Sequence, residues 1–430
     1  MRNGIKLISC GRLIDGSGNP PKKNVAVLIE GSRIKAVAEE GELRAPKGAE
    51  AIDVSDKTVM PGLFDCHLHF YGMSTDNFLA AHFDSPQVTV IRSVASARRL
   101  LEAGYTTVRD CGGINGLALR RAIAEGSIVG PRILAAGFIL TQTFGAGDVD
   151  YLPMDVVDYR RAERDFISEA LICDGVSECV QSARYALRKG ADFIKICASG
   201  GVLSKGNRPE HAQFTLEEIR AIVQEAKHVG KFVVAHAMGT EGIRNAITCG
   251  VRTIDHAWYP DDECVRLAKE KGSIFVPTLS WDLQIIRRGE EGGYSTWAIE
   301  KEREAWKERV KRIRRAHRKG ATMASGTDFC DTPLTKMGEN AMELESLVRY
   351  CGFTPMEAIV AATANGAKAC ALENATGRIE AGKLADLLVV DGDPSKDIAL
   401  LQHKERIQLV LKEGLTVVDR RPGTGLPAGS

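Results

Sequence analysis

Hydrophobic and polar residues follow two different patterns along the chain, and the change between them divides it. Over the first 57 residues, short runs rich in β-branched residues are separated by glycine turns, at Lys6–Leu13, Val25–Glu30 and Ile34–Ala38. The same pattern returns after residue 370, at Leu384–Val390 and Ile407–Lys412. Runs of this kind predict a small β-sandwich or meander. We therefore expect residues 1–57 and 371–421 to form one composite β-sandwich domain, followed by a disordered tail at 422–430.

Between these ends, from 58 to 370, strand-like apolar runs alternate with amphipathic helical stretches. One helix is predicted between the capping box Thr215–Glu218 and Gly230. Repeated βα units of this length predict an α/β fold, a closed parallel (β/α)8 TIM barrel. The eight candidate strands are the run that holds His67, then Thr106–Asp110, Ile133–Leu140, Phe193–Cys197, Phe232–His236, Thr253–His256, Ile274–Leu279 and Thr322–Asp328.

Length and charge narrow the class of protein. A chain of 430 residues suits a large barrel with a second small domain. The formal net charge of +1 gives no reason to expect a nucleic acid or an anionic membrane as the main partner. No stretch approaches the roughly 20 apolar residues that span a bilayer, and Met1–Ile8 has the pattern of a first strand rather than of a signal peptide. We expect a cytoplasmic protein.

The eleven cysteines point to the same compartment. None forms a Cys-x-x-Cys pair, and most stand in apolar, strand-like contexts. This usage is typical of reduced thiols in the core of a cytosolic protein. Cys173 and Cys179, in a polar segment, are the expected exceptions.

His67 and His69 are the first sign of a functional site. If their run is a strand, residues i and i+2 point to the same face, so the two imidazoles make one half of a metal site. Alone, such a pair is weak evidence, because a histidine is often a hydrogen-bonded side chain near a surface.

Other polar residues also stand at the ends of candidate strands. Each has an ordinary explanation by itself: a satisfied core histidine, a surface lysine or a helix cap. Side chains at the carboxyl ends of barrel strands build the active site, however, and six residues at such ends are hard to dismiss. They are His67, His69, Lys195, His236, His256 and Asp328.

This pattern resembles the amidohydrolase superfamily, in its binuclear-metal branch. The resemblance covers nearly the whole chain. Within the superfamily, the chain looks most like the imidazolonepropionase-related dipeptidases, which are metal-dependent hydrolases of Xaa-Pro, N-acyl-proline or Xaa-Arg/Lys substrates. The matching segments are Pro61–His69, the strand lysine Lys195, the two later histidines, Ser325–Asp328, Gly377–Leu387, Gly190–Ile196 with Ser199–Val202, Thr107–Gly113 and Leu140–Thr143.

The resemblance implies two divalent metal ions, with zinc the expected element. His67, His69 and Asp328 would hold the more buried ion, and His236 and His256 the second. Imidazole and carboxylate ligands suit zinc, and water between two cations loses its proton near neutral pH. Asp328 would then be the general base that passes this proton to the leaving amine.

Lys195 has an unusual role in the same scheme. A bare ammonium among Phe193, Ile194, Ile196 and Cys197 would be costly without a partner. The resemblance implies that carbon dioxide converts it to a carbamate that bridges the two ions. Carboxylation turns a poorly placed cation into a hard anionic oxygen ligand.

The expected substrate pocket departs from that of the relatives. Many of them carry a histidine after the Gln-Thr of the third strand, where this chain has Gln142, Thr143 and Phe144. Some Xaa-Pro hydrolases have a tyrosine after the fifth-strand ligand, where this chain has Met238 two residues on. Phe144 and Met238 favour a more apolar pocket and an N-acyl or otherwise less polar substrate. His211 is a candidate for the missing polar contact or an exposed loop residue.

Arg109, at the end of the second strand, leaves two alternatives open. It either binds a substrate carboxylate or pairs with Asp110 beside it.

The leading hypothesis is an enzyme that hydrolyses an amide bond in a dipeptide or an N-acyl amino acid. An alternative with the same metal ligands is hydrolysis of a cyclic amide, a lactone or a carbamate. A third is a non-catalytic relative that keeps the barrel as a scaffold, although such relatives usually lose ligands. A mononuclear deaminase is disfavoured, because Lys195 would have no role. We expect a small-molecule amide or peptide substrate and a homo-oligomer.

Overall fold

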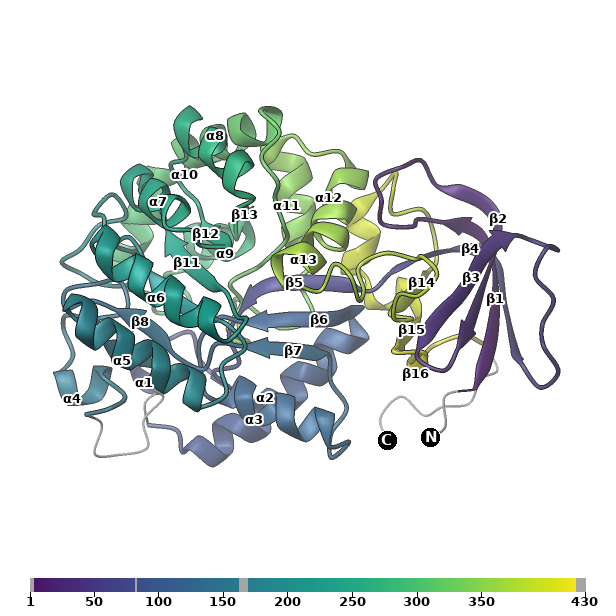
Figure 1. Cartoon of the computed structure of the whole chain (residues 1–430), viewed down its shortest axis with the longest axis horizontal. Helices are drawn as coiled ribbons and strands as arrows, with labels where there is room; N and C mark the ends of the chain where they lie inside the picture. The colour runs from purple at the N-terminus through teal and green to yellow at the C-terminus, as the bar shows by residue number, and fades with distance from the viewer. Residues whose placement is uncertain (1–3, 82, 162–168, 423–430) are drawn as a thin grey trace.

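Strands from both ends of the chain form one seven-stranded sheet, drawn at the right of Figure 1. The computed structural model describes residues 4–81, 83–161 and 169–422. The strand order is β16-β15-β14-β4-β1-β2-β3, and antiparallel pairing of β14 with β4 joins the two chain ends. The strands are β1 (Ile5–Leu13), β2 (Lys22–Glu30), β3 (Arg33–Glu39), β4 (Glu50–Pro61), β14 (Leu387–Val390), β15 (Ile407–Lys412) and β16 (Leu415–Asp419).

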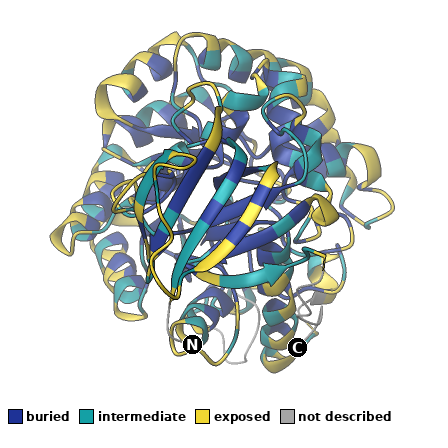
Figure 2. Cartoon of the chain, turned by 90° about the vertical axis from the view of Figure 1, so that its right-hand side faces the viewer, coloured by how far each residue is buried: buried dark blue, intermediate teal, exposed yellow. Residues whose placement is uncertain are grey.

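The expected β structure from the two ends is therefore confirmed, and all of its strands belong to one hydrogen-bonded sheet. Buried and exposed residues alternate between Ala51 and Ser55 in β4, and its last four residues are all buried. Figure 2 shows buried and exposed residues side by side along the strands that face the viewer. The inner side chains of β4 pack into a core with Ile8, Val27, Leu387 and Leu409. Of the tail expected to be disordered, residues 423–430 lie outside the described part of the chain.

Parallel strands build the barrel in two sheets, with strand orders β5-β6-β7 and β13-β12-β11-β10-β8-β9. The strands are β5 (Leu63–Leu68), β6 (Tyr105–Asp110), β7 (Arg132–Ala135), β8 (Ile139–Thr141), β9 (Ala170–Ile172), β10 (Ile194–Cys197), β11 (Val233–Ala237), β12 (Thr253–His256) and β13 (Ile274–Val276). The predicted third strand, Ile133–Leu140, is interrupted: it forms β7 and β8, because Gly137 between them adopts a φ of 71° that extended backbone does not allow.

The predicted eighth strand is not a regular strand either. The segment Thr322–Asp328 makes only the isolated bridge of Met323 to Phe275. Its backbone nevertheless closes the barrel, since Ala324 N donates to Phe275 O and Cys66 N donates to Ser325 O, both at 2.9 Å. The wall between β13 and β5 is thus completed by an extended segment that never becomes a full ladder.

Helices surround the barrel (Figure 1). They are α1 (Phe78–Ala81), α2 (Pro86–Glu102), α3 (Asn115–Ala124), α4 (Met154–Val157), α5 (Gly175–Arg188), α6 (Leu216–His228), α7 (Thr240–Thr248), α8 (Asp262–Lys271), α9 (Leu279–Arg288), α10 (Thr296–Arg318), α11 (Met342–Cys351), α12 (Pro355–Ala361) and α13 (Ala364–Ala369), with the 3₁₀ helices η1 (Ile398–Gln402) and η2 (Lys404–Arg406). The capping box predicted at Thr215 and Glu218 is present at the start of α6.

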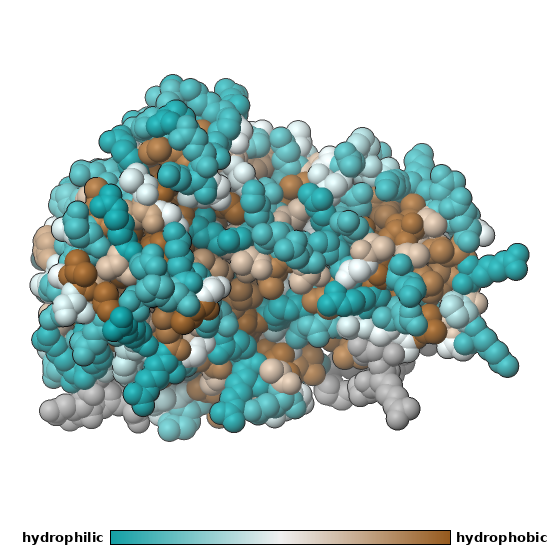
Figure 3. Space-filling view, in the orientation of Figure 1, coloured by the Kyte–Doolittle hydropathy of each residue, from teal (hydrophilic) through white to brown (hydrophobic). Residues whose placement is uncertain are grey.

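Hydrophilic side chains cover most of the face seen in Figure 3. Within the described residues, no helix combines the length and the apolar character needed to cross a bilayer.

All eleven cysteines are buried and free. The expectation that Cys173 and Cys179 differ from the others is wrong, because both thiols are fully buried between β9 and α5, with their sulfur atoms 3.7 Å apart.

An ion pair lies inside the barrel, fully enclosed by protein. Arg109, from β6, and Asp255, from β12, are both 0% exposed, and Arg109 Nη2 lies 3.1 and 3.2 Å from the two carboxylate oxygens. Arg109 Nε also donates to Cys66 O at 2.5 Å, and Thr253 Oγ1 donates to Asp255 at 2.9 Å. The guanidinium holds the pKa of Asp255 well below its usual range, although burial alone would raise it.

This pair predicts a large stability effect for Arg109→Met, which keeps the volume but leaves the charge of Asp255 buried without its guanidinium. The free energy of unfolding should fall by about 3–5 kcal/mol in urea denaturation. Arg109→Met with Asp255→Asn should recover part of the loss, because the second change removes the unpaired charge. A loss below about 1 kcal/mol in the single variant would show that the pair contributes little.

Candidate metal centre

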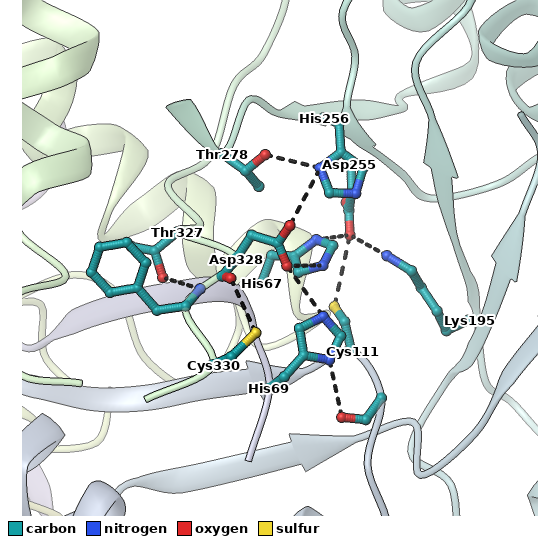
Figure 4. Close-up of polar contacts among 12 residues, drawn as sticks. His67, His69, Cys111, Lys195, Asp255, His256, Thr278, Thr327, Asp328 and Cys330 are labelled. Carbon is teal, nitrogen blue, oxygen red and sulfur yellow. Dashed lines mark hydrogen bonds and ion pairs between the residues drawn. The ribbon is translucent and has the colours of Figure 1, made fainter. Parts of the chain in front are cut away.

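His67 lies in β5 and His69 directly follows that strand, and both side chains contact the same carboxylate, as their i and i+2 spacing predicts. Their ring centroids are 5.3 Å apart. Their Nε2 atoms lie 3.3 and 3.2 Å from a single oxygen of Asp328, Oδ1 (Figure 4). The two imidazoles and the carboxylate therefore converge on one point at the mouth of the barrel.

Asp328 is held at that point by its backbone. The amide nitrogens of Thr327 and Asp328 both donate to His67 O, at 3.0 and 2.6 Å. Asp328 has a φ of 63°, a left-handed conformation that Asp tolerates better than most residues. This turn ends the barrel segment and directs the carboxylate back across His67 and His69.

His256 and His236 stand on the opposite side of the same mouth, at the ends of β12 and β11. The His256 ring centroid is 4.9 Å from that of His67 and 4.5 Å from that of His236. His256 Nδ1 lies 2.9 Å from the Thr278 hydroxyl, and His236 Nε2 lies 3.0 Å from Gly200 O. One nitrogen of each ring is thus committed to a protein partner, which leaves the other free to bind a metal.

Lys195 lies on β10 and is almost fully buried. Its Nζ is 3.3 Å from Asp255 Oδ2, the oxygen that also lies 2.8 Å from His67 Nδ1. The partner that the sequence required for Lys195 is therefore Asp255, as Figure 4 shows.

Burial and neighbouring charges set the protonation of these groups. Burial, together with the Lys195 charge, lowers the pKa of both His67 and His236 to about 4. Burial, with the nearby His236, also holds the pKa of His256 well below its usual value. Burial also opposes a charge on His69, but Asp328 outweighs it and raises the pKa of His69 to about 8. For Asp328, the adjacent imidazoles overcome burial and hold its pKa below the usual value.

These donors fit a metal site. Ligand atoms of His67, His256 and Asp328 all lie within 4.8 Å of one another. The lowered pKa values of His67 and His256 keep these imidazoles neutral at pH 7, and Asp328 is ionised, which are the protonation states that a divalent cation requires. The set of nitrogen and oxygen donors is typical of zinc.

All six predicted ligands line a single cavity of about 540 Å³. Away from them, its wall is mostly apolar and aromatic. Those residues include Phe78, Leu79, Tyr151, Met238, Trp281, Tyr294 and Trp297. Met238, predicted to face the substrate, is one of them.

The other predicted substrate contacts are not in that wall. Arg109 is completely buried on Asp255, so both its expected substrate role and its expected pairing with Asp110 are wrong. Gln142 is turned toward the backbone of Phe214, which donates to its Oε1. Phe144 is 51% exposed, and His211 is an exposed residue whose Nδ1 accepts from Arg208 N. These side chains do not face the cavity and are not candidate contacts for a substrate there.

Sequence reasoning missed three polar residues at this centre: Asp255, Tyr71 and Glu169. Asp255 immediately precedes a ligand in an otherwise apolar strand, a signal that the sequence did contain. Tyr71 stacks on His69, with centroids 4.7 Å apart, and donates its hydroxyl to Glu169. Glu169 is about 100 positions from its partner, so no local pattern could have joined the two.

The low pKa of His67 predicts a pH-dependent stability. An exposed histidine in the unfolded chain has a pKa near ~6.5, so between pH 6.5 and 4 the unfolded state takes up a proton that folded His67 does not. Its contribution to the free energy of unfolding is therefore lost as pH falls through that window. The free energy of unfolding of the metal-free protein should drop between pH 7 and pH 5, and His67→Asn should reduce this drop by about 2 kcal/mol.

Urea denaturation at both pH values measures this difference. His403→Asn, which replaces an exposed histidine, is the matched control and should behave as the parent protein does. If the free energy of unfolding drops equally in the parent and in His67→Asn, the low pKa of folded His67 would be contradicted.

Known proteins share both the sequence and the architecture. The model of the amidohydrolase family matches residues 58–417. An ochratoxinase from Aspergillus niger is 33% identical, over 98% of this chain and 88% of its own length. An imidazolonepropionase from Clostridium tetani is 24% identical, over 91% of this chain and 90% of its own.

Among solved structures, a Xaa-Pro dipeptidase with methionine bound in its active site is 32% identical. It superposes with a TM-score of 0.85 and covers 96% of this chain and 99% of its own. The barrel fold and the resemblance inferred from the motifs are confirmed. The chain belongs to the amidohydrolase family and is a hydrolase of that kind.

Proposed function

We propose that this hydrolase uses two metal ions to cleave the amide bond of a dipeptide or an N-acyl amino acid. The observation that carries the proposal is the convergence of His67, His69, Lys195, His236, His256 and Asp328 on one cavity of about 540 Å³. The similarity to a Xaa-Pro dipeptidase and to an ochratoxinase supports amide hydrolysis at such a site.

Each ligand has a place in the proposed centre. His67, His69 and Asp328 would hold one ion, because their donor atoms already meet. His236 and His256 would hold the other. Two bound zinc ions would supply an activated water at neutral pH and polarise the scissile carbonyl.

Lys195 would serve both ions as a carbamate. Carboxylation removes the ammonium charge at Nζ and leaves one N–H, which can still donate to Asp255 Oδ2 at the observed distance of 3.3 Å. Asp255 would then hold the modified Lys195 side chain in place.

Asp328 would handle the proton of the reaction. The depressed pKa keeps it a carboxylate at pH 7, which can accept a proton from the attacking water. Its Oδ1 also contacts His69 Nε2 at 3.2 Å, so the carboxylate is oriented before substrate binds. The proton would then pass to the leaving amine.

A cyclic amide, lactone or carbamate is the alternative substrate class. The sequence identity of 24% with an imidazolonepropionase supports this alternative, since the same metal ligands would serve a ring-opening reaction. The cytoplasmic location and the homo-oligomer expected from the sequence remain predictions.

A substrate panel is the direct test of the proposed function. Purified protein loaded with zinc in bicarbonate should hydrolyse members of a combined dipeptide and N-acyl amino acid library. Removal of metal with a chelator should abolish turnover, and zinc should restore it. Turnover of cyclic amides or lactones alone would favour the alternative.

Lys195→Ala tests the binuclear centre. We expect kcat/KM to fall at least ~10³-fold, and metal content measured by mass spectrometry to fall from two ions per chain to about one or fewer. The reason is that the bridging ligand is lost. Lys205→Ala, which replaces another lysine of the cavity wall, is the control and should keep both ions. A fully active Lys195→Ala enzyme would exclude the bridge.

A further inference from the structure

Glu169 is an acid in the wall of the cavity for which the proposed reaction has no use. Glu169 directly precedes β9. Its carbonyl accepts a hydrogen bond from Ile139 N of β8 at 2.9 Å, which fixes the Glu169 backbone to β8. Its Oε1 accepts a hydrogen bond from the Tyr71 hydroxyl. Since Tyr71 stacks on His69 with an interplanar angle of 16°, the carboxylate lies one side chain away from a proposed metal ligand.

The second oxygen of this carboxylate lacks a partner. Glu169 Oε2 is buried and makes no hydrogen bond within the part of the chain that is described. It lies against the backbone of Gly112, where a Cβ would come within 2.7 Å of it. Glycine at this position therefore makes room for the carboxylate.

An ionised carboxylate held in this way is costly when no cation is bound to it. Burial raises the pKa of Glu169, because the ionised carboxylate loses its water without gaining enough protein donors. A cation that entered the cavity and bound this carboxylate would remove that cost.

The remaining acids of the cavity wall already have partners. Asp282 is paired with Arg309, which is itself fully buried. Asp76 Oδ1 accepts hydrogen bonds from Thr332 Oγ1 and from Leu334 N. Apart from the proposed ligand Asp328, Glu169 is thus the acid of this wall whose carboxylate has a buried oxygen with neither a hydrogen bond nor an ion pair in the described part of the chain.

We propose that Glu169 binds the free α-ammonium group of the substrate, which makes the substrate a dipeptide with an unblocked amino end. This inference rests on the proposed function and narrows it. In a dipeptide, the α-nitrogen is only two bonds from the scissile carbonyl carbon, so its binding group must stand beside the metal ligands. Glu169 meets that condition through Tyr71 and His69.

The same geometry disfavours N-acyl amino acids. An acyl group of the same shape without the ammonium would leave the Glu169 carboxylate in the complex with only its Tyr71 hydrogen bond and no cation. A site built around a polar partner discriminates strongly against an analogue that lacks it, for this reason. The apolar and aromatic lining beyond the metal centre would contact the side chains of either substrate equally.

A matched pair of substrates tests the proposal. The first is the best dipeptide from the library, and the second is the same compound with hydrogen in place of the α-amino group. With the zinc-loaded full chain, we expect kcat/KM to favour the dipeptide at least ~10-fold. Glu169→Gln keeps the size and one hydrogen-bond-accepting oxygen but removes the charge, so this preference should fall at least ~10-fold.

A binding readout separates recognition from turnover. The ligands for a calorimetric titration are the N-terminal amino acid that the dipeptide releases and the des-amino analogue of that amino acid. Glu169→Gln should show the same loss of preference between these two ligands, at unchanged zinc content. Asp76→Asn is the matched control, because it removes a cavity acid that already has partners, and it should keep the preference of the parent. Tyr71→Phe should reduce the preference less than Glu169→Gln, since the carboxylate remains.

The outcomes are distinct. Equal kcat/KM for the two substrates, or equal losses on both in Glu169→Gln, would overturn the role of Glu169 while leaving the amide hydrolase intact. Failure of the zinc-loaded parent to cleave either compound or any library member would overturn the proposed function and this inference together.

Discussion

The carboxylate of Asp255 joins four strands inside the barrel, and the candidate centre is built around it. It accepts from Arg109 of β6, lies 2.8 Å from His67 of β5 and 3.3 Å from Lys195 of β10, and itself extends from β12. A carboxylate at 0% exposure is stable only with such partners, because desolvation of a lone charge costs several kcal/mol. The guanidinium of Arg109 supplies the positive charge to both oxygens of Asp255, and Oδ2 also orients a histidine and a lysine at the mouth. Fold stability and site geometry therefore share one interaction.

The way the barrel closes has a similar double role. A regular eighth strand would alternate its side chains and carry the ladder past Asp328. Here the segment before Asp328 hydrogen-bonds to β13 and β5 only at intervals, and then turns with a positive φ at Asp328 itself. The departure from regular pairing places the carboxylate over His67 and His69. A residue in a sparsely populated backbone region at a candidate site is expected when the surrounding hydrogen bonds fix it.

The cavity has two chemically different regions. Imidazoles, Asp328, Lys195 and the Tyr71–Glu169 pair form its polar end, whereas Phe78, Trp281, Tyr294 and Trp297 contribute to an apolar region. Polar groups in such a pocket fix the orientation of a ligand, and the apolar area contributes most of the binding energy. Of the side chains predicted from the sequence to select the substrate, only Met238 faces this space. The pocket is therefore apolar, as expected, but its walls come from other residues.

The sequence by itself determined the barrel, the β structure from both chain ends and the six candidate ligands. These follow from local rules: strand periodicity, capping, and the position of His67, His69, Lys195, His236, His256 and Asp328 at strand ends. What only the tertiary structure decided depends on distance in space. Arg109 meets Asp255 across 146 positions and not its neighbour Asp110, and Tyr71 meets Glu169 across 98, so neither contact leaves a periodic signal in the chain. The break at Gly137 and the irregular closing segment were hidden for a related reason. Whether an apolar run becomes a full strand depends on the partners that the rest of the barrel offers it, and those partners are set only when the barrel closes.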